Sequence, residues 1–418
     1  MIAALGFAGL LGIGAPIAFV LIAAALILLT EQGSTALLPV FPQQLFAGIE
    51  NYSLLALPLF ILLGELMGAG GIGRRLLALA QAIMPPFRAG LAHVNLLANL
   101  MMSALLGSTV AQLTVMSRLA VPEMERAGYP RDMATAITAA GGLLAPVVPP
   151  SMNLIVFAAI AQLPVADLFL ASVWPGLAMG LAFTVVICWL GRRHGLPRVP
   201  AQPAGARLRA GAAALPALVV PVVAVGSILG GIATPTESAA MAIVAALVVG
   251  GPVYRQLRLA DLPGALTRTA LTSGAVLFLV AAAQVLGWVV TFGNLPAMAA
   301  EAMQQIASSP LMFLLLMNVA LLLIGTVMEP IPAIILTAPV LLPVATTAYG
   351  IDPVSFGVIL CLNLALGLLT PPVGAGLYTA ALLTGVRAER LSRLLLPFFT
   401  AVLGVLLAMT VLAARAAT

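Results

Sequence analysis

The sequence predicts an all-α polytopic membrane protein, organised as an inverted-topology repeat with two re-entrant helical hairpins and two broken helices. The first observation is composition: 62% of the 418 residues are hydrophobic, 7% are charged, and the mean hydropathy is +1.17. Soluble domains carry about 25% charged residues, so this chain could not cover a water-facing surface. The second is the recurrence of apolar runs long enough to cross about 30 Å of hydrocarbon. The third is a set of three motifs shared by the two halves.

Arginine placement predicts the orientation of the spans. All eighteen basic residues are arginine, and most lie in loops 71–90, 122–132, 191–210, 252–268 and 385–393, whereas loops 31–51, 162–167, 293–310 and 348–353 have none. Because cytoplasmic loops carry an excess of Lys and Arg, the first set is expected inside. Segments 91–121 and 311–347 then begin and end on one side, so each is predicted to be a re-entrant hairpin. Ten spans complete the prediction: a short N-terminal helix, 16–30, 52–70, 132–161, 168–190, 214–232, 235–252, 269–291, 354–384 and 391–413.

The three shared motifs predict an internal repeat. "LGIGAPIAF" (11–19) matches "GGIATPTES" (230–238), "NLMMSALLGSTVAQ" (99–112) matches "NVALLLIGTVMEP" (318–330), and "GGLLAPVVPPSMN" (141–153) matches "LGLLTPPVGAGLY" (366–378). The charge of the corresponding loops is opposite in the two halves, which indicates opposite orientation in the membrane. We therefore expect one repeat in 1–212 and a second in 213–418, each with a hairpin (about 91–121 and 311–347) and a broken helix (about 132–161 and 354–384). Such repeats are typical of secondary transporters.

The prolines of the third motif predict the helix breaks. Pro149 and Pro150 align with Pro371 and Pro372, and proline ends a helix because it lacks the backbone N–H. A break exposes carbonyls at a helix C-terminus, which suit a cation, and amides at a helix N-terminus, which suit a carboxylate. The alternative is a simple kink whose freed groups are satisfied by neighbouring helices. A matched pair of multi-proline breaks favours the functional interpretation.

Small hydroxyl residues at the two hairpin tips face these breaks in the predicted topology. Neutral hydroxyl and carbonyl oxygens suit a weakly held hard cation such as Na⁺. The alternative is that each hydroxyl bonds its own helix or packs between small residues. The first predicted Na⁺ site comprises Ser103, Gly107, Ser108, Thr109, Gly142 and Ala145. The second comprises Gly325, Thr326, Gly367, Thr370 and Val373. The predicted site for an anionic substrate comprises Ser151, Asn153 and Thr109.

Other polar residues within apolar runs have structural and functional interpretations. Glu329, close to the second tip, is either a proton relay or a helix cap. Glu65 and Glu237 could also relay protons, but Glu65 is expected to pair with a neighbouring helix, and Glu237 in "TPTESAA" to lie at a helix N-terminus capped by Thr234 or Thr236. Arg118 either holds an anion or extends to the membrane interface. His93 and His194 are expected at the interface, and Asn95, Asn99, Asn318 and Asn363 are expected to join helices.

Several function classes are excluded or poorly supported. No GxSxG, HExxH or paired-carboxylate motif is present, so an enzyme is not expected. Cys188 and Cys361 lie in apolar spans with no CxxC, so neither a metal site nor a disulfide is expected. No cofactor beyond Na⁺ as a coupling ion is predicted, and nucleic acid is not an expected partner. The N-terminal run lacks a basic segment and is expected to be a membrane helix rather than a removed signal peptide.

The motifs together resemble the large membrane subunit of tripartite ATP-independent periplasmic (TRAP) transporters. The matching pieces are "GIGAPIAF", "LALPLFILLGELMGAGGI", "GSTVAQ", "VPEMERAGYPRDMATAITAAGGLLAPVVPPS", "GGIATPTESAA" and "GLLTPPVGAGLY". The resemblance implies an elevator-type transporter in the bacterial inner membrane, in which hairpins and broken helices form a mobile transport domain and the other helices form a scaffold. It also implies a soluble periplasmic substrate-binding protein, a separate small four-helix membrane subunit, and Na⁺ symport of a small organic anion such as a carboxylate or acidic sugar.

Two departures and two alternatives accompany this resemblance. Gln112 occupies a position where the family usually has an acid, and Arg118 is unusual within the hairpin, so the substrate class stays open. One alternative is a stand-alone Na⁺/carboxylate symporter or exchanger that works without a binding protein. The other is an ion channel, although the sequence has no evident filter motif.

Overall fold

The computed structural model describes residues 2–84, 87–198, 204–371 and 373–417, and the described residues form helices without any β-strand. Met1 and Pro372, for which the sequence made predictions, lie outside the described residues. Among those described, eight helices are long and apolar enough to cross a membrane. These are Tyr52–Ala69, Val165–Arg193, Arg207–Leu229, Pro235–Val253, Leu259–Phe292, Pro310–Val327, Pro330–Ala348 and Ala388–Ala416. The expectation of an all-α, multi-pass membrane protein is therefore confirmed.

The first half contains the predicted hairpin and broken helix. The hairpin consists of α6 (Gly90–Leu106) and α7 (Thr109–Arg126), and the broken helix consists of α8 (Arg131–Gly142) and α9 (Met152–Ala161), followed by the long α10 (Val165–Arg193). Before them come α1 (Ile2–Gly12), α2 (Ile17–Glu31), η1 (Thr35–Val40), α3 (Phe41–Ala47), η2 (Tyr52–Leu55), α4 (Ala56–Ala69) and α5 (Ile72–Ile83).

The second half repeats this order. Its hairpin consists of α16 (Pro310–Val327) and α17 (Pro330–Pro343), its broken helix of α18 (Pro353–Gly367) and α19 (Ala375–Thr384), and α20 (Ala388–Ala416) closes the chain. The remaining elements are α11 (Ala204–Pro221), η3 (Val222–Gly226), α12 (Ser227–Leu229), α13 (Pro235–Val248), η4 (Val249–Val253), η5 (Leu259–Asp261), α14 (Leu262–Phe292), α15 (Leu295–Ile306) and η6 (Val344–Ala348).

The two breaks have different local causes. Prolines, which have no backbone N–H, interrupt the first helix, and a glycine with left-handed backbone geometry ends the second break. The first break, residues 143–151, carries three prolines and ends at Ser151, whose Oγ accepts a hydrogen bond from Leu154 N at 3.4 Å and so caps α9. The second break, residues 368–374, ends at Gly374, which has φ +42° and begins α19. Glycine adopts this conformation without steric cost.

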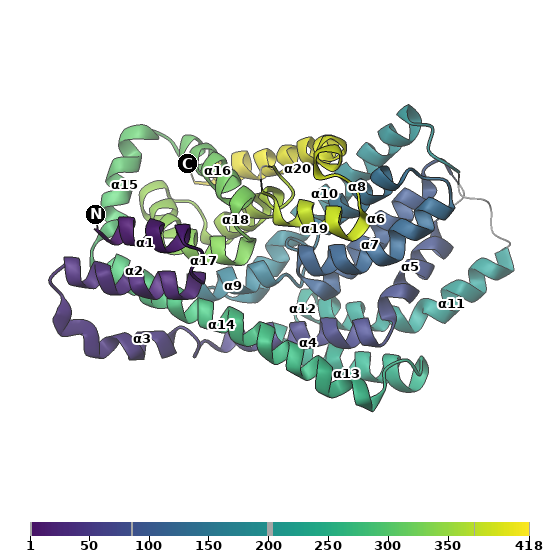
Figure 1. The fold of residues 1–418 in the computed structure, drawn as a ribbon, viewed down its shortest axis with the longest axis horizontal. Coiled ribbons are helices and arrows are strands. Elements are labelled where there is room, and N and C mark those ends of the chain that lie inside the picture. The colour runs from purple at the N-terminus through teal and green to yellow at the C-terminus, as the bar shows by residue number, and fades with distance from the viewer. Residues whose placement is uncertain (1, 85–86, 199–203, 372, 418) are drawn as a thin grey trace.

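Helices of the two repeats pack against each other in a shared core, which occupies the upper part of the molecule in Figure 1. Limb α7 of the first hairpin packs against α19, and limb α17 of the second hairpin packs against α9. In the same way α8 packs against α20 and α18 against α10. Each hairpin therefore supports the broken helix of the other repeat as well as its own. A second layer contains α2, α4, α13 and α14; the last three lie in the lower part of Figure 1, and α2 lies at the left.

Two predictions about acidic residues are confirmed in this second layer. Glu65 on α4 pairs with Arg268 on α14, with Oε2 and Nε 2.7 Å apart. Thr234 is the N-cap of α13: its Oγ1 accepts from Glu237 N, and Glu237 Oε2 accepts from Thr234 N. This reciprocal arrangement is a capping box, which stabilises the first turn of α13 by giving two of its backbone N–H groups acceptors.

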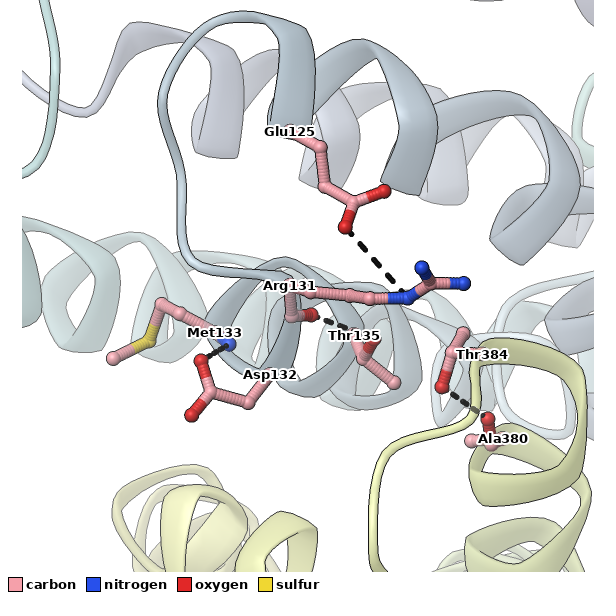
Figure 2. Close-up of polar contacts among 7 residues, drawn as sticks. All are labelled: Glu125, Arg131, Asp132, Met133, Thr135, Ala380 and Thr384. Carbon is pink, nitrogen blue, oxygen red and sulfur yellow. Dashed lines mark hydrogen bonds and ion pairs between the residues drawn. The ribbon is translucent and has the colours of Figure 1, made fainter.

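Ion pairs join the arginine-rich ends of the helices in the shared core. Figure 2 shows Glu125 of α7 and Arg131 of α8 pointing toward each other, with Oε1 and Nε 3.6 Å apart. Asp132 accepts from Met133 N at 2.8 Å, as Figure 2 shows. Asp132 also pairs with Arg390 at the start of α20. The first hairpin, the first broken helix and the last helix are thereby tied together at one end.

Candidate functional site

Both hairpins and both breaks contribute to one small cavity of about 50 Å³. The sequence predicted a tip facing a break within each repeat, and the structure brings the two sets together around a single space. The lining residues are Gly107, Ser108, Thr109, Val110, Pro146, Asn153, Glu329, Pro330, Ile331 and Leu368.

Three helices begin at this cavity. The first turns of α7, α9 and α17 supply Thr109, Asn153 and Pro330 to its lining. A helix N-terminus carries partial positive charge and unpaired N–H groups, so three of them around one space favour an anion. Asn153 is 5% exposed, and its Nδ2 has no hydrogen-bond partner in the described structure. A buried amide donor without a partner is costly unless a ligand or water accepts from it.

The first tip is docked on the first break through its backbone. Gly107 has φ +55°, and its carbonyl accepts a hydrogen bond from Met152 N at 3.4 Å. A Cβ built on Gly107 would lie 3.1 Å from Pro150 O, so glycine suits both the conformation and the close approach. Ser151 Oγ donates to Pro146 O at 2.6 Å and closes the break from the other side.

The second tip makes the corresponding bond. Gly374 N donates to Thr326 O at 2.8 Å, so the amide that begins α19 reaches the second hairpin as Met152 N reaches the first. Gly325 and Thr326 lie in the last turn of α16 rather than at the turn itself, which falls at Met328 and Glu329. The predicted pairing of tip and break is therefore present in the geometry of both repeats.

Among the residues predicted for the first Na⁺ site, some oxygens already have a hydrogen-bond partner, whereas the Thr109 hydroxyl has none among the described residues. Ser103 Oγ donates to Leu100 O of its own helix at 2.7 Å, and Gly142 O accepts from Ala145 N at 3.3 Å. Thr109 is 4% exposed and its Oγ1 has no partner in the described structure. Thr109 thus combines burial, a free hydroxyl and a place on the cavity wall.

The hydroxyls predicted for the second Na⁺ site bond their own helices. Thr326 Oγ1 donates to Leu323 O at 2.7 Å, and Thr370 Oγ1 donates to Leu366 O at 2.8 Å. Each hydroxyl oxygen still has lone pairs for a cation. Gly367 is buried against Gly325, whereas the Val373 side chain is exposed.

A buried amide network joins the first hairpin to α8, and the sequence predicted the helix-joining role of Asn95 and Asn99 but not that of Gln112. Gln112 Nε2 donates to Asn99 O at 2.9 Å, to Asn99 Oδ1 at 2.8 Å and to Gly141 O at 3.2 Å. Asn95 Nδ2 donates to Thr138 Oγ1 at 2.7 Å. These contacts link α6, α7 and α8 around the helix end that precedes the first break.

The second repeat has its own, smaller network. Asn363 Nδ2 donates to Asn318 O and Oδ1, both at 2.9 Å, and Asn318 Nδ2 donates to Thr410 Oγ1 at 2.8 Å. The expectation that these asparagines join helices is confirmed, as it is for Asn95 and Asn99. The sequence feature that predicted these contacts was an asparagine side chain within an otherwise apolar segment.

Three other ionisable residues belong to the two hairpins. Glu329 is exposed, lines the cavity, and makes no side-chain cap bond to α17. Arg118 is exposed on α7. His93 is 5% exposed: its Nδ1 bonds Ala89 O at 3.0 Å, and its Nε2 lies 3.4 Å from Cys188 Sγ. Its expected place at the membrane interface stays a prediction. No group of three or more His, Cys, Asp or Glu suited to a metal occurs among the described residues.

Comparison with known proteins gives the family. The family model described as "Tripartite ATP-independent periplasmic transporter, DctM component" matches residues 4–414. The 2,3-diketo-L-gulonate TRAP transporter large permease protein YiaN of Escherichia coli is 36% identical over 88% of this chain and 86% of its own length. The sialic acid TRAP transporter large permease protein SiaM of Vibrio cholerae is 36% identical over 94% and 91%. The C4-dicarboxylate TRAP transporter large permease protein DctM of Pseudomonas aeruginosa is 37% identical over 88% and 86%.

The fold is shared with a solved transporter. The crystal structure of the YdaH transporter of Alcanivorax borkumensis superimposes with a TM-score of 0.67 over 92% of this chain and 88% of that chain, at 16% sequence identity. The apolar helices and the permease relatives together identify a multi-pass protein of the bacterial inner membrane. Since the family model and these relatives cover nearly its whole length, the chain belongs to the DctM component of the tripartite ATP-independent periplasmic transporters and is a large membrane subunit of that family.

Proposed function

We propose that the chain imports a small organic anion by Na⁺ symport through an elevator mechanism. The observation that supports this most directly is the cavity at the two tips and two breaks, where three helix N-termini and the unpartnered Asn153 amide meet. This surrounding favours a carboxylate. The relatives are named for substrates that are all carboxylates: 2,3-diketo-L-gulonate, sialic acid and C4-dicarboxylate.

Na⁺ would bind on either side of the substrate, in the two tip-and-break pairs. The first site uses the free hydroxyl of Thr109 together with Ser103, Gly107, Ser108, Gly142 and Ala145. The second uses carbonyl and hydroxyl oxygens of Gly325, Thr326, Gly367, Thr370 and Val373. A cation here would offset the charge of the anionic substrate and give the buried, unpartnered Thr109 hydroxyl oxygen a partner. At least two Na⁺ are needed to carry a dianion without net negative charge movement.

The moving unit would be the two hairpins and the two broken helices. The cross-packing of α7 on α19 and α17 on α9 supports this, because it joins the two hairpins and the two broken helices around the cavity. The layer of α2, α4, α13 and α14, held by the Glu65–Arg268 pair, would belong to the scaffold. A periplasmic binding protein would deliver the substrate, and a small four-helix membrane subunit would bind the scaffold.

Uptake into proteoliposomes with a varied Na⁺ gradient, with and without the binding protein and small subunit, tests this function. We expect uptake only with both a Na⁺ gradient and the binding protein, and weaker Na⁺ dependence in Ser108→Ala and Thr326→Ala. If both variants keep the full Na⁺ dependence, the site assignment is wrong. Uptake without any binding protein would indicate a stand-alone symporter, and flux uncoupled from Na⁺ would indicate a channel.

A further inference from the structure

Two connections of the chain meet beside the end of α10. The segment that leads into α6 and the segment that follows α10 form an isolated antiparallel β-bridge between Arg88 and Arg198, and Ala89 N donates to Pro197 O at 3.1 Å. Residues opposed in an antiparallel pair have Cα atoms about 4.5–5.5 Å apart. Like charges in such a position repel each other and are destabilising.

More positive charge surrounds this bridge. Gly191 at the end of α10 lies against Ala89, since a Cβ built on it would lie 2.8 Å from Ala89 Cβ. Arg192 and Arg193 follow Gly191 directly, and both are exposed, as are Arg88 and Arg198. We call these four residues the arginine corner: Arg88, Arg192, Arg193 and Arg198.

The arginine corner has no acidic partner in the described part of the chain. By contrast, Arg126, Arg131, Arg268 and Arg390 are each paired with a carboxylate. Arg192 and Arg193 complement the negative end of the α10 dipole, but Arg88 and Arg198 lie outside any helix. The described part of the chain therefore offers Arg88 and Arg198 neither a carboxylate nor a helix C-terminus to offset their charge.

An apolar stripe on α10 places the arginine corner at the level of lipid headgroups. Large exposed side chains recur every three or four residues, which puts them on one face of the helix. The stripe ends at Trp189, one turn before the arginines, and the guanidinium carbon of Arg193 lies 5.1 Å from the Trp189 ring centroid. Tryptophan is enriched at the membrane–water interface. The stripe comprises Trp174, Leu177, Leu181, Val185 and Trp189.

We propose that the arginine corner binds the phosphate of an anionic phospholipid whose acyl chain lies along the α10 stripe. Guanidinium groups bind phosphate through paired, charge-assisted hydrogen bonds. One phosphate between Arg88 and Arg198 would remove their repulsion and hold the two connections together. The arginine-rich side is cytoplasmic by the positive-inside rule, so the lipid belongs to the inner leaflet. The site does not depend on the transported substrate or on Na⁺.

Quenching of Trp189 fluorescence by brominated lipids tests this proposal. The chain has three tryptophans, so Trp174→Phe with Trp288→Phe leaves Trp189 as the reporter. The full-length protein is reconstituted in phosphatidylcholine vesicles that contain a rising fraction of brominated phosphatidylglycerol or, separately, brominated phosphatidylcholine. We expect phosphatidylglycerol to reach half-maximal quenching at a several-fold lower fraction. Equal quenching by the two lipids would overturn the proposal.

Variants separate the arginine corner from general attraction to a charged membrane. Arg88→Gln with Arg198→Gln should remove most of the preference for phosphatidylglycerol, so that the two lipids quench at nearly equal fractions, and the Lys pair at the same positions should retain most of it. Arg387→Gln with Arg393→Gln, on another arginine-rich loop, should leave it unchanged. If the first pair does not fold, Arg192→Gln with Arg193→Gln replaces it. Equal loss in the Arg387 and Arg393 control, or relief of quenching by inorganic phosphate alone, would reject a lipid site.

Discussion

Gly325 and Gly367 lie backbone against backbone where the second hairpin meets the second broken helix. A Cβ built on Gly367 would lie 2.6 Å from Gly325 Cα, and one built on Gly325 would lie 3.1 Å from Gly367 Cα. Both residues are in the last turn of their helices, α16 and α18. A side chain at either position would therefore separate the hairpin from the break, which is the contact that the proposed second cation site requires.

Replacing Gly367 with alanine tests this contact. The added methyl group has no space, so Gly367→Ala should destabilise the protein by about 1–3 kcal/mol through overpacking and should lower Na⁺-dependent uptake. Thermal unfolding and proteoliposome uptake measure the two effects. Gly404→Ala on α20 is the control, because a Cβ there meets nothing within 4 Å. A Gly367→Ala protein with wild-type uptake would contradict the proposed role of this close approach.

Asn153 should determine affinity for the transported anion. Loss of a hydrogen bond to a charged group costs about 1.5–3 kcal/mol, so Asn153→Ala should raise the KM for substrate by about tenfold or more. The concentration of Na⁺ for half-maximal uptake should change little. Asn153→Asp has nearly the same shape but places an acidic group at the cavity, and it should bind an anion more weakly than Asn153→Ala. The reverse order would argue against a carboxylate at this position.

Thr109 should contribute to cation binding through its free hydroxyl. Thr109→Val keeps the shape of the side chain but removes the oxygen, so we expect a higher Na⁺ requirement and a smaller change in substrate affinity at saturating Na⁺. Thr184→Val on α10 is a matched control, because Thr184 Oγ1 already donates to Gly180 O at 2.9 Å in its own helix. Identical Na⁺ titrations for the wild type and Thr109→Val would remove Thr109 from the site.

The sequence predicted local breaks better than long-range contacts. Prolines and glycines fix where α8 and α18 end, because their effect is on their own backbone. The Thr234 capping box was also predictable, since its partners are three residues apart. The meeting of His93 with Cys188 was not, because 95 residues separate them and nothing local marks either as a partner. The lining of the single cavity was predicted only in part: Gly107, Ser108, Thr109 and Asn153 were named, whereas the contribution of Leu368 depends on how one repeat packs on the other.

Gln112 was singled out in the sequence only as a departure from the family pattern, and its structural role was not predicted. Its Nε2 is the donor for three buried oxygens: Asn99 O, Asn99 Oδ1 and Gly141 O. Gln112→Leu would leave the buried Asn99 Oδ1 without a donor, at a cost of about 1–3 kcal/mol, whereas Gly141 O keeps its bond from Leu144 N. We therefore expect a clearly lower unfolding temperature, measured by light scattering or fluorescence in detergent. Gln304→Leu, on the exposed face of α15, is the control and should unfold like the wild type. An unchanged unfolding temperature for Gln112→Leu would show that water or a neighbouring group replaces the lost donor.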